Sequence, residues 1–202
     1  MNEWKVDMIS MSFGWPSSDF ENYDVLEQAI DKAYSKKVLM FAAASNSGGR
    51  SGRAYPASSP HVICVHSTDT DGDRSGFSPT AERNTINLAT VGQSVQSAWP
   101  MLLCEDGEHV KTRSGTSYAT PIMVGITAFL LSFARLHLSE KETQGLMRKE
   151  KIECLLRRCA ERGPNYQPRD GYFYVELSLS RHNLFGQDLE EIRREFLKVL
   201  RL

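Results

Sequence analysis

The sequence is poor in cysteine, and its few cysteines are not spaced as metal ligands or as a disulfide framework. The 202-residue chain has four, irregularly placed and without a C-x-x-C pair. Zinc sites and small disulfide-stapled folds require closer and more regular spacings. We therefore expect no metal site, and reduced thiols at Cys64, Cys104, Cys154 and Cys159.

An excess of charge of one sign is also absent. Lysine and arginine number 24 and aspartate and glutamate 25, which gives a net charge of -1, and the two signs are interspersed. Surfaces that bind nucleic acid or anionic membranes need a concentrated basic patch. The composition therefore favours peptide or small-molecule chemistry and predicts no nucleic-acid partner.

The sequence offers no leader and no convincing membrane span. Residues 1–10, "MNEWKVDMIS", contain no basic start followed by an apolar run, so a cytoplasmic location is expected. The one long uncharged stretch, residues 114–134, is interrupted by Gly115, Pro121 and Gly125. Its continuous apolar part is short for a spanning helix, so we predict a buried core helix and no membrane partner.

The order of apolar segments predicts an α/β fold. Short apolar runs bounded by Gly, Pro, Ser and Asp indicate strands, and "VLMFAAA" is typical of a strand covered on both faces of a parallel sheet. Spacings of three and four residues predict helices. The strands are expected at 6–13, 38–44, 62–66 and 86–89, and the helices at about 23–34 and 117–138.

Composition changes after residue 138. Residues 140–162 are highly charged with a thin apolar stripe, which predicts a surface helix ended by Gly163-Pro164. A strand is expected over 172–179 and an amphipathic helix over 188–200. We interpret residues 139–202 as an α+β C-terminal extension that packs on residues 1–138 and carries no identifiable chemistry.

The stretch "SGTSYATP", residues 114–121, places a hydroxyl where an apolar helix begins. There the Ser117 hydroxyl would lie near unpaired backbone N–H groups and the positive end of the helix dipole, which favour developing negative charge. Serine in this setting is equally suited to be a helix N-cap. The motif alone leaves both roles open.

Neighbouring segments support the first role. The run "GTSYATP" followed by "IMVGITAFLLS" resembles the nucleophile segment of the subtilisin-like serine proteases (peptidase S8). In the correct order before it, "ISMSFG", "LMFAAASNSGG", "YPASSPHVICVHSTD" and "FSPTAERNTINLATVGQSVQS" resemble further segments of that family. The resemblance implies a three-layer parallel-sheet fold, with residues 1–138 as the C-terminal part of a peptidase domain.

The resemblance also implies catalytic roles. Ser117 would attack a peptide carbonyl, and its backbone N–H together with the Asn46 side chain would hold the oxyanion. The Asn46 amide donates hydrogen bonds without adding a charge, which suits charge that appears only in the transition state. The alternative for Asn46 is a turn residue beside Gly48 and Gly49.

Two segments would bind the peptide substrate. By resemblance, residues 11–14 would pair with an extended substrate backbone and residues 43–46 would form the facing wall, although both could be plain sheet edges. Ser45 stands where the family usually has glycine, so extra atoms should narrow or polarise the pocket. The candidate substrate-binding residues are Ser12, Phe13, Gly14, Ala44 and Ser45.

The groups that activate a serine are not found. A serine hydroxyl needs a base in hydrogen-bond reach and a third group to orient that base. The family supplies an Asp in a "DTG"-like strand end and a His in "HGTH", both before the segment that begins this chain, and none of its five histidines precedes Gly-Thr. We expect an N-terminally truncated domain whose missing segment is a partner, and whose apolar sheet edge makes the isolated chain poorly soluble.

Three functions are compared. The first is a serine endopeptidase acting through an acyl-enzyme, with this chain inactive alone. The second is a catalytically dead peptide-binding module or gene fragment. The third, a nucleotide-binding domain, is disfavoured because no G-x-G-x-x-G or G-x-x-x-x-G-K-[ST] opens a helix. We expect no cofactor, and no compact carboxylate cluster suggests a calcium site.

Overall fold

The computed structural model describes residues 5–103, 109–160 and 168–202, and its main element is a parallel sheet of five strands in the order β1-β2-β3-β4-β7. The strands are β1 (Met8–Met11), β2 (Leu39–Ala43), β3 (Ile63–Thr68), β4 (Leu88–Val91) and β7 (Phe173–Tyr174). Every neighbouring pair runs parallel. The predicted α/β fold with a parallel sheet is confirmed.

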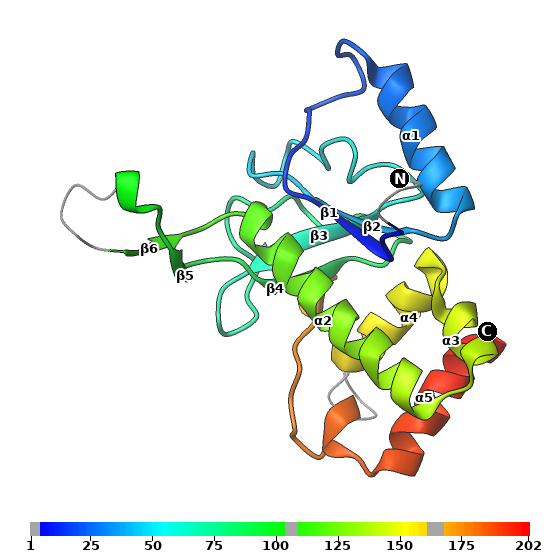
Figure 1. The fold of residues 1–202 in the computed structure, drawn as a ribbon. Coiled ribbons are helices and arrows are strands. Elements are labelled where there is room, and N and C mark those ends of the chain that lie inside the picture. Colours follow the sequence, from blue (N-terminus) through cyan, green and yellow to red (C-terminus); the bar gives the residue numbers. More distant parts are fainter. Residues whose placement is uncertain (1–4, 104–108, 161–167) are drawn as a thin grey trace.

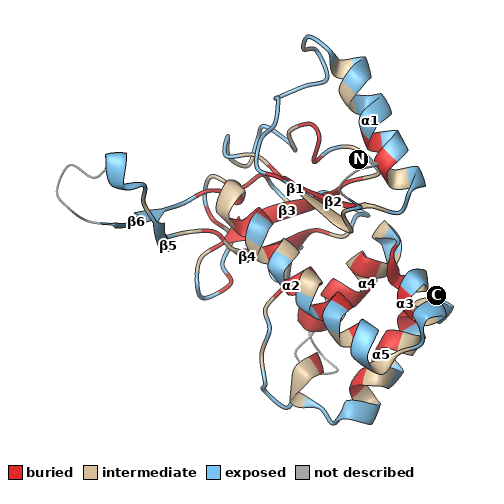
Figure 2. Cartoon of the chain, viewed as in Figure 1, coloured by how far each residue is buried: buried red, intermediate tan, exposed pale blue. Residues whose placement is uncertain are grey.

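Alternate residues of the central strands enter two separate cores, one on each face of the sheet. On β2, Leu39 and Phe41 belong to the core beneath helix α2 (Thr116–His137), whereas Met40 and Ala42 join the core with helix α1 (Tyr23–Ser35). Strands alternate side chains between faces, so continuous apolar runs require cover on both. The result is a three-layer arrangement, with buried residues in the sheet and on the inward faces of the helices (Figure 2).

Helix α2 crosses the sheet and contacts four of its strands, β1 to β4 (Figure 1). In the described part of the chain it is the one helix with the length and composition of a membrane span, and 44% of its apolar window is buried. Its fully buried residues include Met123, Leu130 and Leu131, which pack in the same core as Leu39 and Phe41 of β2. One face of α2 is therefore buried in the core, in agreement with the core helix predicted from the sequence.

The predicted single surface helix over 140–162 is wrong. The structure has two helices, α3 (Glu140–Leu146) and α4 (Lys149–Ala160), and the first begins with a capping box between Ser139 and Glu142. The apolar stripe is fully buried at Leu146, Ile152, Leu155 and Leu156, so these helices pack inward. The predicted stop at Gly163-Pro164 lies outside the described residues.

The C-terminal region also joins the sheet and the core. Only Phe173 and Tyr174 of the predicted strand over 172–179 are in a strand, which pairs with β4. Helix α5 (Leu189–Arg201) follows a short 3-10 helix, η2 (Leu184–Gly186), and buries Phe196 against Phe133 of α2. The boundary at residue 138 stays a prediction.

A hairpin not predicted from the sequence precedes α2. It consists of β5 (Val95–Ala98) and β6 (Val110–Arg113), with a 3-10 helix, η1 (Met101–Leu103), after β5, and it projects from the rest of the protein (Figure 1). Its strands are mostly exposed, so no buried apolar pattern marked them. The hairpin leads directly into the segment that carries Ser117.

Three cysteines are described, and all are free thiols: Cys64, Cys154 and Cys159. Burial raises the pKa of Cys64 and of Cys159 to about 12. Such thiols stay protonated near neutral pH and are poor nucleophiles and metal ligands. The prediction for Cys104 falls outside the described residues.

Candidate active site

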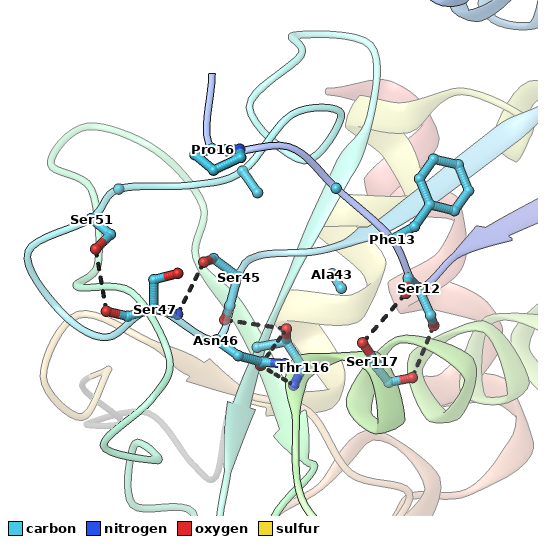
Figure 3. Close-up of a pocket in the computed structure, with 13 residues that line it drawn as sticks. Ser12, Phe13, Pro16, Ala43, Ser45, Asn46, Ser47, Ser51, Thr116 and Ser117 are labelled. Carbon is cyan, nitrogen blue, oxygen red and sulfur yellow. Dashed lines mark hydrogen bonds between the residues drawn. The ribbon is translucent and has the colours of Figure 1, made fainter. Parts of the chain in front are cut away.

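The carboxyl ends of β1 and β2 and the first turn of α2 surround one cavity of about 280 Å³ (Figure 3). In open parallel sheets, ligands bind at the carboxyl ends of the strands. None of the 13 described residues that line this cavity is charged: Ser12, Phe13, Gly14, Pro16, Ala43, Ser45, Asn46, Ser47, Ser51, Gly52, Ala54, Thr116 and Ser117.

Ser117 lies in the first turn of α2 and is not the N-cap. The N-cap is Gly115, which makes no side-chain capping bond. The Gly115 amide donates to the carbonyl of Gly92, at the end of β4, over 2.8 Å. A Cβ on Gly92 would lie 2.6 Å from Ser67 Oγ and 2.9 Å from Ala119 Cβ, so glycine permits this close approach.

Two hydrogen bonds connect Ser117 to the end of β1. The Ser12 hydroxyl donates to the Ser117 carbonyl over 2.9 Å, and the Ser117 hydroxyl donates to the Ser12 carbonyl over 3.4 Å. The second distance exceeds the usual range for O–H···O bonds. The Ser117 hydroxyl is therefore only weakly engaged by the Ser12 carbonyl and can turn toward a base.

Asn46 is oriented by the residue before Ser117. Its Oδ1 accepts from the Thr116 amide over 2.9 Å and lies 3.0 Å from the Thr116 hydroxyl. Within the described residues its Nδ2 donates no hydrogen bond, so this N–H2 group is available to donate to an anion in the cavity. Thr116 is a site residue that sequence reasoning missed, although its place in "GTS" beside Ser117 was the available signal.

Most of the predicted substrate-binding residues meet at the cavity, but Ala44 does not. Ser12, Phe13, Gly14 and Ser45 line the cavity with Asn46 and Ser117. Ala44 is fully buried, and its amide donates to the Val65 carbonyl over 3.0 Å. Because side chains alternate, Ala43 faces the cavity where Ala44 was expected.

None of the five histidines, all within the described residues, lines the cavity. His66 is buried near Cys64, and its Nδ1 lies 3.4 Å from Ser78 Oγ. Burial, followed by the nearby Arg53 and Arg74, lowers the pKa of His66 to about 3. His66 is thus a neutral core residue and not a base for Ser117.

No group of three or more His, Cys, Asp or Glu side chains that could hold a metal ion occurs in the described part of the chain. The loop 69–73 carries three aspartates, and the carboxylates of Asp69 and Asp73 have protein partners. Asp69 accepts from the amides of Asp71 and Asp73, and Arg169 pairs with Asp73. This loop is held by an arginine from the C-terminal region.

Comparison with known proteins identifies the family. The sequence profile of the subtilase family matches residues 2–174. Subtilisin DY of Bacillus licheniformis is 34% identical over 130 residues, covering 63% of this chain and 43% of that protein. The subtilisin-like protease het-Q2 of Podospora anserina is 31% identical over 153 residues, covering 75% and 41%.

Solved structures agree on the fold. The prenylagaramide maturation protease PagA superposes with a TM-score of 0.66 at 22% identity, covering 97% of this chain and 62% of that one. A PatG macrocyclase in complex with peptide gives 0.65 at 22%, covering 98% and 53%. The chain thus spans between 41% and 62% of the length of these relatives. It belongs to the subtilase family, the subtilisin-like serine proteases.

Proposed function

We propose that this chain is the nucleophile-bearing portion of a serine endopeptidase. Ser117 Oγ attacks the carbonyl carbon of a peptide bond, the C–N bond breaks, and the amine leaves with a proton while the acyl group stays on Ser117. Water then hydrolyses the acyl-enzyme ester. The observation that supports this proposal is the convergence of Ser117, Asn46 and the end of β1 on one cavity.

The oxyanion would be stabilised by two N–H donors. One is the Ser117 amide, since amides in the first turn of a helix have no partner within it. The other is Asn46 Nδ2, because Thr116 engages Oδ1 and directs the amide. Donors held in place before the reaction stabilise the charge without reorganisation.

The substrate would lie as an extended strand beside residues 12–14. β1 is an edge strand, and Ser12, Phe13 and Gly14, which follow it, are exposed. An added strand gains backbone hydrogen bonds from such an edge, and side-chain pockets give specificity. This placement brings the scissile carbonyl toward Ser117.

We further propose that the base and its orienting carboxylate come from a segment outside residues 1–202, and that the chain alone hydrolyses no peptide. The lining of the cavity is uncharged in the described residues. On α2, Phe129 and Leu136 are 47% and 78% exposed, and no charged residue occurs over 116–134. An uncharged helix face next to an edge strand suits burial by the same domain's missing segment.

Chemical rescue tests the proposal. A p-nitrophenyl peptide ester is incubated with the chain, with and without free imidazole, and nitrophenolate release is followed. We expect Ser117-dependent release only with imidazole, because the added base takes the proton that no described side chain can take. Ser117→Ala corrects for hydrolysis by imidazole itself, and Asn46→Leu should lower the rescued rate about 10²-fold or more.

A second candidate, a peptide-binding module without catalysis, is favoured by one observation: the cavity forms although no histidine or carboxylate lines it in the described residues. Equal nitrophenolate release by the native chain and Ser117→Ala, with retained peptide binding, would support this candidate.

Reading the native transcript in frame upstream of the Met1 codon tests whether the base is encoded before this segment. The expected segments contain Asp-x-Gly and His-Gly-Thr.

The remaining sequence-based expectations stay predictions: a cytoplasmic location, and no nucleic-acid or membrane partner.

A further inference from the structure

The cavity beside Ser117 is rich in hydroxyl groups. Its described lining contains five serines and one threonine, and no side chain that carries a charge: Ser12, Ser45, Ser47, Ser51, Ser117 and Thr116. A charged substrate side chain placed there would lose hydration without gaining an ionic partner. The chemistry of the lining therefore disfavours Lys, Arg, Asp and Glu in the residue that enters the cavity.

Two of these hydroxyls keep a proton to donate. Ser45 Oγ accepts a hydrogen bond from the Ser47 amide over 3.1 Å, and neither the Ser45 nor the Ser47 hydroxyl donates one within the described residues. The Ser51 hydroxyl, by contrast, donates to the Ser47 carbonyl over 3.2 Å. Figure 3 shows the Ser45 and Ser47 side chains close together on the segment that follows β2.

The backbone at Ser45 is strained. Its φ of +150° lies in a region that favours glycine. The carbonyl of Ser45 is held by the Thr116 hydroxyl over 3.2 Å, which fixes this conformation beside the site. A non-glycine residue in such a conformation costs stability and persists where the surroundings hold it, and strained residues of this kind cluster at functional sites.

We propose that this cavity selects an uncharged amide side chain, Gln or Asn, in the substrate residue before the scissile bond. Ser45 and Ser47 donate to the amide oxygen, while Ala43, Gly52 and Ala54 leave room beside it. An apolar side chain of similar size would cover both hydroxyls without replacing their hydrogen bonds to water. This inference rests on the proposed function, because it assigns the substrate class of the same cleft.

The test is a binding measurement, which needs no catalysis. Fluorescein-labelled peptides of one sequence carry Gln, Leu, Phe, Glu or Lys at the residue before the scissile bond. Fluorescence anisotropy with the 202-residue chain should show Gln binding about tenfold more tightly than Leu, with Glu and Lys weaker than Gln. The same series is measured with Ser117→Ala, where the preference should persist because recognition precedes chemistry.

Matched variants assign the preference. Ser45→Ala should bring the Gln-to-Leu ratio close to one, whereas Ser51→Ala, whose hydroxyl already has a partner in Ser47, should leave the ratio unchanged. Thermal unfolding by circular dichroism verifies that both variants fold. A Leu or Phe peptide that binds as tightly as Gln, a ratio unaffected by Ser45→Ala, or no binding by any peptide would overturn the inference.

The two proposals can fail separately. Imidazole-rescued acylation of Ser117 without a Gln preference would overturn the inference and leave the endopeptidase proposal standing. A Gln preference in a chain that is never acylated would support the inference about the cavity and overturn the endopeptidase proposal.

Discussion

Ser12 and Ser117, 105 positions apart in the sequence, are joined by reciprocal hydrogen bonds between the hydroxyl of each residue and the carbonyl of the other. The pair connects the carboxyl end of β1 to the first turn of α2. It thereby holds the candidate nucleophile beside the segment proposed to bind substrate. Both residues line the cavity, so a change at one alters the surroundings of the other.

Replacing Ser12 with alanine should lower the free energy of unfolding by about 1 kcal/mol or less, the net value of one hydrogen bond in a solvent-exposed setting. Urea unfolding followed by tryptophan fluorescence measures the change. Ser10→Ala, at an exposed position on β1, is the matched control and should have a smaller effect. An equal loss in both variants would show that the Ser12 contact contributes nothing.

Replacing Gly92 with alanine should destabilise the fold by about 1–3 kcal/mol, the usual cost of overpacking. The added Cβ would lie 2.9 Å from both the Gly115 carbonyl oxygen and Ala119 Cβ, so α2 must shift away from β4. Gly125→Ala is the control, because its Cβ meets nothing within 4 Å and alanine favours the helix. The two variants should therefore change the urea midpoint in opposite directions.

Replacing Ser45 with glycine should raise the free energy of unfolding by about 1 kcal/mol, because relief of an unfavourable φ exceeds the added flexibility of the unfolded chain. Chemical unfolding at equilibrium measures it. The control is Ser47→Gly, because Ser47 lies nearby and does not have a positive φ. This substitution should be neutral or destabilising. A Ser45→Gly variant less stable than the native chain would show that the Ser45 side chain contributes more than its backbone costs.

The core of the α/β fold follows from the sequence because it depends on local patterns. The uninterrupted apolar run over 38–44 becomes β2, whose five residues are all buried, and helical spacing correctly marked α1. The motif around Ser117 placed the start of α2 to within one residue. In each case local propensity and tertiary burial agree, which makes the assignment reliable.

The features that the sequence did not predict depend on the three-dimensional structure, because no local pattern encodes them. The hairpin β5–β6 exposes most of its side chains, so no alternation of apolar and polar residues marks it. The break between α3 and α4 follows from the backbone at Met147, whose ψ of 52° leaves the helical region. At the site, Asn46 could be named from resemblance, but its orientation by Thr116 required the three-dimensional structure.

The buried His66 should make stability depend on pH. Its pKa is lowered to about 3 in the folded chain, mainly by burial, from an unfolded value near 6.5. Between these two pH values the unfolded chain binds one proton more than the folded chain. The stability that depends on a neutral His66 is therefore fully present above about pH 6.5 and is lost as the pH falls toward 3. The slope is at most about 1.4 kcal/mol per pH unit.

Urea unfolding between pH 7 and pH 4 measures this slope for the native chain and for His66→Gln. The glutamine variant is expected to be less stable at pH 7, because it disturbs a buried site, and to have a shallower pH dependence. His182→Gln, at an exposed histidine, should retain the native slope. If His66→Gln retains it as well, other groups cause the acid sensitivity.

The predicted division at residue 138 can be tested through Phe196 of α5. Its side chain is fully buried, with its ring 5.1 Å from that of Phe133 in α2. Truncation to alanine should cost about 3–5 kcal/mol. Leu189→Ala, at a position on α5 that is 45% exposed, is the control and should cost much less.

The location of the fluorophores makes this test decisive. All three tryptophans lie within residues 1–99, so their fluorescence reports only on the part before residue 138, whereas far-ultraviolet circular dichroism also reports α3, α4 and α5. Because the C-terminal helices share one core with α2 and the sheet, Phe196→Ala should shift both transitions to the same lower urea concentration. Early loss of helix signal with an unchanged tryptophan transition would instead show that residues 139–202 unfold as an independent extension.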